Sequence, residues 1–385
     1  MRRLPTFAIG LLLLVILVER WTARGAEADS AAAAAEHAEG PGPRAATVGA
    51  MPTGPGDEGA DPERLASQRC FGDLMAFDGM SGFDGVRAAL AAGLPSDDPL
   101  LGDYLRDLIA ERIGESAERA LEVLSWAEGA HAADAQLLLE GLARSKGALD
   151  LRVASRLVEL GARAGLDEQV RAAALDAVRV QPALEPADRT RLAALALDEA
   201  VPATAWHATR ALGGVMVERE RLGGDTGPYW DELARVAAQS DDAAVRALAL
   251  EAPMHADSIL PKEKIATLLA LFPNEPHRDV RELAIFQLGL TDSPTDALEA
   301  MRQAFDGEYD ECVRWAIVRF SVRAASEQSL PLLEHFARID PAFEQDLADF
   351  RELFAAGFRD FEQIWLHKAE RHACAVEDGE PHGAL

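Results

Sequence analysis

The sequence predicts an all-α fold, an α-solenoid of about seven two-helix HEAT-like units with helical caps at both ends. Three observations lead to this prediction. A motif, Asp-x-x-Val-Arg, returns at intervals of about 35 residues. Apolar residues follow each Val with helical spacing, and a proline comes about half a unit later. A period of this length is typical of stacked helix pairs, each of which buries its apolar face only against its neighbours.

The motif marks the first helix of each unit. Its residues are Asp167, Val170, Arg171, Asp242, Val245, Arg246, Asp279, Val280, Arg281, Asp310, Val313 and Arg314, with Asp279 in a variant that sets the Asp directly before the Val. Asp accepts hydrogen bonds from the free N–H groups of a first turn, and its charge suits the positive end of the helix dipole. Each Asp, Asp279 included, is therefore predicted to cap its helix.

Other units carry weaker forms of the same pattern. Taking the Val as the anchor, the equivalent residues are Leu105, Ala135 and Ala205, and Leu137 is an alternative to Ala135. The unit around Ala205 lacks both charged residues of the motif and has Pro202 and Trp206 instead. The Arg after each anchor is expected to pair with acids of the adjacent unit, because stacking brings equivalent positions together. The alternative is an anion-binding ladder.

Prolines mark the second helix of four units. Pro186, Pro261, Pro294 and Pro331 follow their anchors, and proline is tolerated in the first turn of a helix but not in its interior. The predicted second helices are 187–198, 262–271, 294–305 and 331–338.

The Asp-x-x-Val-Arg-x-x-Ala start, seen from Asp242 to Ala249, resembles the HEAT-repeat family, including its short bacterial forms related to phycobilisome-lyase-like repeats. The resemblance covers about 99 to 340. It implies a stack that supplies binding surfaces for proteins and mostly lacks catalysis of its own.

The two ends differ from the repeats. Residues 1–24 have a basic start and a short apolar run at 4–18, which predicts an export signal or an N-terminal membrane anchor, with cleavage left open. We expect a disordered linker rich in Ala, Gly, Pro and acids at 25–64, followed by an N-terminal helical cap at 65–98 that contains a helix at Val86–Ala92. The solenoid occupies 99–340, the C-terminal capping helices 341–375 and a disordered tail 376–385.

Composition narrows the choice of partner. The chain has 38 Lys and Arg against 65 Asp and Glu, a formal charge of −27. Such a surface repels phosphate backbones and anionic lipid, which argues against nucleic acid and favours basic protein partners.

Candidate chemistry is confined to the C-terminal segment. His367, Glu370, His372 and Cys374 could contribute to a zinc or copper site, although on a helix His372 would point away from the other three, and a further ligand such as His382 would be needed. Our interpretation is instead a terminal helix with Phe361, Ile364 and Trp365 on its core face. Cys312 is predicted to be a small buried residue.

No nucleotide, zinc-protease or redox motif occurs in the sequence. The sequence therefore favours an exported, membrane-tethered scaffold in the cell envelope, which binds a protein, uses no cofactor and is not an enzyme. The alternative is an enzyme or metal-binding protein that uses the His367–Cys374 segment.

Overall fold

The computed structural model describes residues 77–93, 99–198, 200–255, 259–369, 371–372 and 374. The chain divides into two units, Met1–Pro62 and Glu63–Leu385, and everything below concerns the second. The predicted export signal, linker, C-terminal tail, Cys70 and Glu370 all lie outside the described residues.

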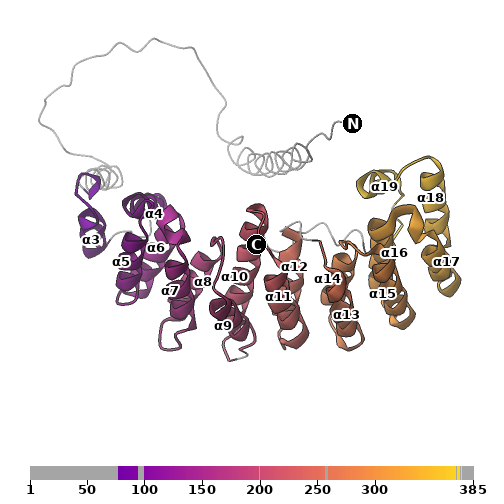
Figure 1. The fold of residues 1–385 in the computed structure, drawn as a ribbon, viewed down its shortest axis with the longest axis horizontal. Helices are drawn as coiled ribbons and strands as arrows, with labels where there is room; N and C mark the ends of the chain where they lie inside the picture. The colour runs from indigo at the N-terminus through magenta and orange to yellow at the C-terminus, as the bar shows by residue number, and fades with distance from the viewer. Residues whose placement is uncertain are drawn as a thin grey trace, which may run out of the picture. The chain divides into compact units, whose positions relative to one another are not determined.

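Helices follow one another in two parallel rows (Figure 1). Row A consists of the first helix of each unit: α4 (Pro99–Ile113), α6 (Ala132–Ala143), α8 (Glu168–Val178), α10 (Pro202–Arg221), α12 (Ala243–His255), α14 (Arg278–Leu288) and α16 (Glu311–Ala325). Row B consists of the second: α5 (Ala117–Ala127), α7 (Leu151–Ala162), α9 (Pro186–Ala196), α11 (Gly227–Gln239), α13 (Lys262–Leu271), α15 (Pro294–Gly307) and α17 (Leu330–Ile339). Each helix contacts its predecessor and successor in its own row, and contacts between the rows, such as α7 with α8 and α9 with α10, hold the two rows together.

This arrangement confirms the predicted all-α solenoid. Short 3₁₀ turns, η1 (Lys146–Leu149), η2 (Phe272–Asn274) and η3 (Ser326–Ser329), join some of the helices. Among the described residues the one β-type pairing is an isolated bridge between Leu260 and Thr291.

The repeat anchors explain why the helices stack. Every predicted anchor lies on a row-A helix and is at most 4 % exposed: Leu105, Ala135, Val170, Ala205, Val245, Val280 and Val313. Leu137, the alternative to Ala135, is buried on the same helix. The residues four positions after the motif Val, such as Ala174 and Ile317, are buried as well. One continuous core therefore runs between the rows, as expected for units that cannot exclude water from their apolar faces alone.

Small residues bring the row-A helices close together. A side chain at Gly213 of α10 would place its Cβ 2.5 Å from the Cβ of Ala252 on α12. A side chain at Gly141 of α6 would meet Ile109 of α4 at 2.8 Å. Glycine at these positions is required by packing, since any larger residue would push two helices apart.

Helix starts follow the predicted chemistry in most units. The Asp167, Asp242 and Asp310 carboxylates accept hydrogen bonds from backbone N–H groups of the first turns of α8, α12 and α16. The prediction for Asp279 is wrong, because α14 begins after His277 without a side-chain cap. Asp279 lies in the first turn itself, two residues after the capping position His277, where its charge still suits the helix dipole.

The prolines mark the second helices as predicted. Pro186 and Pro294 are the first residues of α9 and α15, Pro261 directly precedes α13, and Pro331 is the second residue of α17. At the N-terminal end, the described part of the chain begins with a short turn that leads into α3 (Asp84–Ala91).

The C-terminal end folds back onto the last repeat. After η4 (Pro341–Phe343) come α18 (Glu344–Ala355) and α19 (Phe361–His367), and the helix stops there, although the sequence suggested that it continues to Cys374. Lys368 and His372 both turn inward and bind the buried Asp346 of α18, at 2.5 Å (Nζ–Oδ1) and 2.9 Å (Nε2–Oδ2). The Trp315 ring stacks on His372 at 4.2 Å between centroids.

A disulfide ties this segment to the repeats. Cys374 is bonded to Cys312 on α16, 62 residues earlier, so the prediction that Cys312 is merely a small buried residue is wrong. Within the part of the chain that the structure describes, no helix is long and apolar enough to cross a membrane.

Candidate interaction surface

A ladder of buried ion pairs runs along the edge where one unit connects to the next. Arg246 of α12 donates to both carboxylate oxygens of Glu275, at 2.7 and 2.9 Å, and also to the backbone carbonyls of Ser240 and Asp241. Glu275 lies in the loop before α14, so this pair joins two consecutive units. A bidentate arginine–carboxylate pair fixes both distance and orientation.

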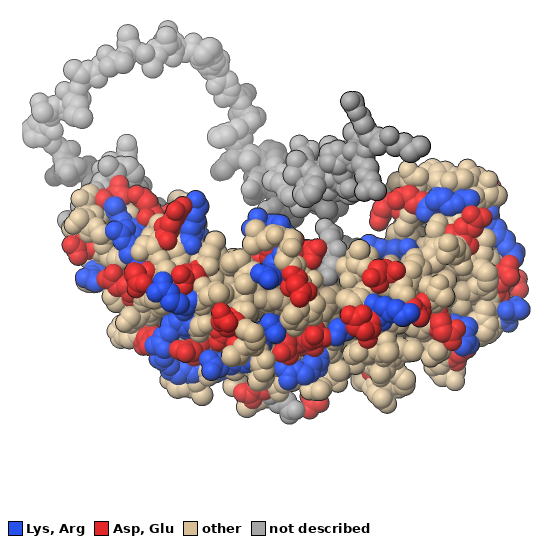
Figure 2. All heavy atoms as spheres, in the orientation of Figure 1, with Lys and Arg blue, Asp and Glu red and all other residues tan. Residues whose placement is uncertain are grey.

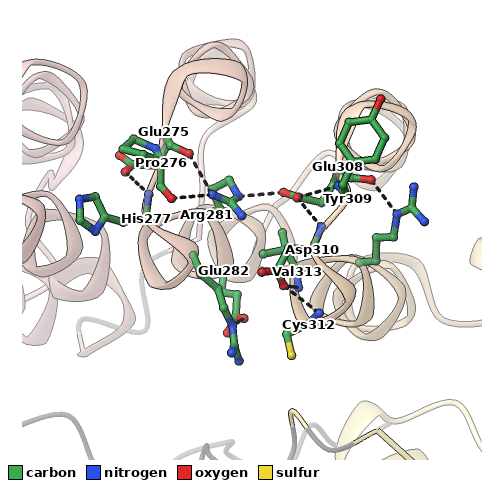
Figure 3. A network of polar contacts seen from close by, with 12 residues as sticks. Glu275, Pro276, His277, Arg281, Glu282, Glu308, Tyr309, Asp310, Cys312 and Val313 are labelled. Carbon is green, nitrogen blue, oxygen red and sulfur yellow. Dashed lines mark hydrogen bonds and ion pairs between the residues drawn. The ribbon is translucent and has the colours of Figure 1, made fainter.

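The next two steps use the same kinds of partner, and Figure 3 shows Arg281 with the Glu308 carboxylate and the Glu275 and Pro276 carbonyls. Arg281 binds the Glu308 carboxylate at 2.8 Å and the carbonyls of Glu275 and Pro276. Arg314 then binds the Glu308 carbonyl at 2.7 Å and the Asp340 carboxylate at 2.9 Å. The carboxylate of Glu275 or Glu308 thus binds the arginine of one unit. The arginine of the next unit binds the backbone carbonyl of that same acid, as Arg281 and Arg314 do.

The ladder is largely shielded from water. The side chains of Arg246 and Glu275 are 10 % and 6 % exposed, and those of Arg281 and Glu308 are 13 % and 8 % exposed. Burial raises the pKa of Glu275, but hydrogen bonds from Arg246 and from the His277 N–H outweigh burial and hold that pKa below its ordinary value. The Glu275 carboxylate is therefore charged and bound to Arg246 at neutral pH.

Arg171 does not join the ladder. It was expected to pair with an acid of the adjacent unit, but its Nε donates to the Gly161 carbonyl of the preceding helix at 2.9 Å. The following unit has Trp206 in place of the motif Arg, so the repeating pattern is interrupted there as well.

An open groove of about 520 Å³ lies beside the ladder, between α13 and α15. Its apolar part consists of Leu269, Phe272, Pro273 and Ala304, and its polar part of Glu275, Arg281, Gln303 and Glu308. Gly307, at the end of α15, also lines it. A second groove of about 460 Å³ lies on the other side of α15, against α17. Apolar surface beside a few fixed polar groups is the usual composition of a binding groove.

Tyr309 stands out on the same edge. Its side chain is 88 % exposed, in the loop that separates α15 from α16, and it points away from the ladder (Figure 3). The adjacent Glu308 carboxylate accepts hydrogen bonds from the N–H groups of Tyr309 and Asp310, so the backbone that carries the tyrosine is held in place. Neither this tyrosine nor the groove could be predicted from the sequence, because neither belongs to the repeating pattern.

The metal-ligand candidates do not form a site in the described part of the chain. Cys374 is consumed by the disulfide, His372 binds Asp346, and the exposed His367 contacts Phe358 and the Gln363 carbonyl. Glu370 is outside the described residues, and no group of three or more metal-competent side chains occurs among those that are described.

Figure 2 shows basic and acidic side chains close together over the visible face of the molecule. Many of these form exposed pairs within one helix, such as Arg302 with Glu299 at 2.7 Å. Exposed pairs of this kind contribute little to stability, because water and salt screen both charges. The ladder differs from them in burial and in linking separate units.

Two rows of helices around one core, with grooves between the row-B helices, define an α-solenoid. Comparison with known families agrees: the family model for HEAT repeats matches residues 265–347, from α13 into α18. The resemblance seen in the motif is thereby confirmed for residues 265–347, and HEAT repeats generally serve as protein-interaction scaffolds. No curated protein matches the chain.

Proposed function

We propose that this protein is an exported, membrane-tethered scaffold without catalytic activity, which binds a protein partner in the groove between α13 and α15. The observation that carries the proposal is the groove itself, which lies inside the stretch that matches HEAT repeats and beside the ladder that fixes its walls.

The residues that line the groove indicate which side chains the partner segment presents. Phe272, Leu269 and Ala304 would take an apolar side chain. The exposed acids Asp279 and Glu311 flank the ladder, and the whole chain carries −27 charges, so basic residues around that apolar side chain would be attracted. The partner segment is therefore apolar at its centre and basic at its edges.

The disulfide supports export. Structural disulfides persist in oxidising compartments and are rare where thiols are kept reduced. The Cys312–Cys374 bond joins α16 to the C-terminal segment, independently of the basic and apolar N-terminal residues that first suggested export.

Partner binding is tested with a variant that fills the groove. A Cβ added at Gly307 would meet nothing within 4 Å, so the backbone leaves room for a side chain there, and Gly307→Trp adds bulk at the edge of the groove. The tagged protein is purified from envelope fractions, and co-purifying proteins are quantified. We expect one protein in stoichiometric amount with the natural sequence and at least about tenfold less with Gly307→Trp.

Gly165→Trp is the matched control, because Gly165 also has open space around it but lies in the loop between α7 and α8. It should recover the partner normally. Gln303→Lys, which adds a positive charge at the groove, should weaken recovery and Gln303→Glu should not. Equal recovery of the partner by all variants would contradict binding at the groove. Recovery of no specific protein would contradict the proposed scaffold function.

Export has its own test. Cell fractionation should place the protein in the envelope, and alkylation before lysis should find Cys312 and Cys374 unreactive until a reductant is added. A protein found in the cytosol with both thiols reduced would contradict export.

A further inference from the structure

A cluster of basic and aromatic side chains lies where α8 meets α10 in row A. It consists of Asp176 on α8, Arg179 directly after α8, and Trp206, His207 and Arg210 on α10. This is the unit that begins with Pro202 and Trp206 instead of the repeat motif.

One carboxylate serves two partners here. An Asp176 oxygen, Oδ1, lies 3.1 Å from His207 Nδ1 and 3.4 Å from Arg210 Nη1. The Arg210 guanidinium also lies over the Trp206 ring, 5.1 Å from its centroid. The contact at 3.4 Å is long for a charge-assisted hydrogen bond, so Asp176 satisfies only part of the hydrogen-bonding capacity of the Arg210 guanidinium.

A second guanidinium group is held beside the first. The stem of Arg179 crosses α10 at Gly214, where an added Cβ would come within 1.9 Å of Arg179 Cγ. Gly214 is one helical turn beyond Arg210, so the absence of a side chain there brings Arg179 next to Arg210. Among the described residues, the Arg179 guanidinium has no hydrogen-bond or ion-pair partner, although its backbone N–H donates to the Asp176 carbonyl at 3.2 Å.

The cluster therefore has more positive than negative charge, in a chain whose total is −27. The Arg210 side chain is 19 % exposed, and its Nε is buried without a hydrogen-bond partner in the described part of the chain. Burial, followed by repulsion from Arg179, lowers the pKa of Arg210. Of the two neighbouring guanidinium groups, only Arg210 contacts a carboxylate within the described residues, and His207 contacts that same carboxylate, so a further anion would complete the cluster.

We propose that Arg179 and Arg210 bind a carboxylate of an acidic peptide segment, with Trp206 packing against the segment. The planar guanidinium groups match a carboxylate in a two-pronged arrangement, and the ring beside them offers apolar surface to the peptide. This site is separate from the groove beside α15 and takes a partner of the opposite charge.

The protein's overall charge makes the proposal specific. An acidic peptide is repelled by most of a surface that carries −27 charges, so it can bind only where positive charge gathers locally. Binding at this site should depend on individual arginines, whereas a diffuse electrostatic attraction would not.

The test uses the full chain and a fluorescein-labelled tetraglutamate amide, with binding followed by fluorescence anisotropy. We expect saturable binding that weakens about tenfold in Arg179→Gln and in Arg210→Gln, since each loses a charge-assisted hydrogen bond. Arg210→Lys keeps the charge but loses the planar fork, and should give an intermediate affinity.

Arg191→Gln is the control, because Arg191 on α9 is 47 % exposed and outside the cluster. It should bind the peptide like the natural sequence, and circular dichroism checks that every variant is folded. The proposal is overturned if the peptide does not bind, or if Arg191→Gln weakens binding as much as the other two. Binding of inorganic phosphate without binding of the peptide would also overturn it, by showing a small-anion site.

Discussion

At the residue scale, the buried charges at the C-terminal end make the clearest case. The side chains of Lys368 and Asp346 are each 1 % exposed and 2.5 Å apart, and the Lys368 ammonium also lies 4.7 Å from the centre of the Trp315 ring. A charge removed from water to this extent is stable only while its partner is present. The short segment after α19 is thus held by specific bonds rather than by helix formation.

Asp346→Asn should be strongly destabilising, because it leaves the Lys368 ammonium buried without a counter-charge. We expect a loss of about 3–5 kcal/mol in the free energy of unfolding, measured by urea denaturation together with hydrogen exchange in α18. Glu334→Gln, which breaks the exposed pair with Arg351, serves as the control and should cost about 1 kcal/mol or less. Similar costs for both changes would show that the buried pair is not essential.

Glu299 gives a prediction about pH. Hydrogen bonds from Arg302, and then from Gln303, lower its pKa from 4.5 to about 2. Since the folded-state pKa lies below that of the unfolded chain, this carboxylate stabilises the fold above about pH 4.5, and its contribution disappears as the pH falls towards 2. The difference in Tm between the natural protein and Glu299→Gln should therefore shrink over that interval. A difference that does not vary with pH would contradict this assignment.

At the element scale, the ladder joins consecutive units where the row-A helices begin. Arg281 and Glu308 are 27 residues apart in sequence yet belong to one buried network with Arg246, Glu275 and Arg314. Because each arginine binds its own unit's loop and the next unit's acid, a change in one step alters the relation between two units.

A double-mutant cycle measures that link. Arg281→Gln and Glu308→Gln should each destabilise the protein, and the pair should show a coupling free energy of about 1–3 kcal/mol in urea unfolding. The same cycle on Arg351 and Glu334, an exposed pair between α17 and α18, should give about 1 kcal/mol or less. Equal coupling in both cycles would mean that burial adds nothing to the ladder.

The elements that repeat were predictable, and those that occur once were not. Val170, Val245 and Val313 mark their helices because each unit must bury an apolar side chain at this position against its neighbours. The Cys312–Cys374 bond depends on how α18 and α19 fold back onto the last repeat. The repeating sequence pattern does not predict this fold-back, because it occurs only once. The groove depends on side chains from three separate segments, and Tyr309 is distinguished only by its exposure.

Asp279 shows a subtler limit. The variant motif placed an acid near a helix start, but moving it two positions along the chain changes a cap into a first-turn residue. Only the backbone geometry shows which residue is the cap, because the sequence motif locates the start of a helix only to within a few residues.

At the scale of the whole molecule, the structure describes a stack with buried links between units and open grooves between row-B helices. The stack positions surfaces from distant parts of the sequence on one rigid support. On our account the groove beside α15 takes a basic, apolar segment, while the α8–α10 cluster takes an acidic one. Such a scaffold could hold two different segments at once.

Site-specific photo-crosslinking in living cells tests the central claim most directly. A benzophenone amino acid replaces Tyr309, next to the groove, or in a parallel strain Leu222, which is 58 % exposed in the loop between α10 and α11. We predict one adduct of defined mass from position 309, none from 222, and loss of the adduct when Gly307→Trp fills the groove. No adduct from position 309, or an adduct unaffected by Gly307→Trp, would contradict binding at this groove.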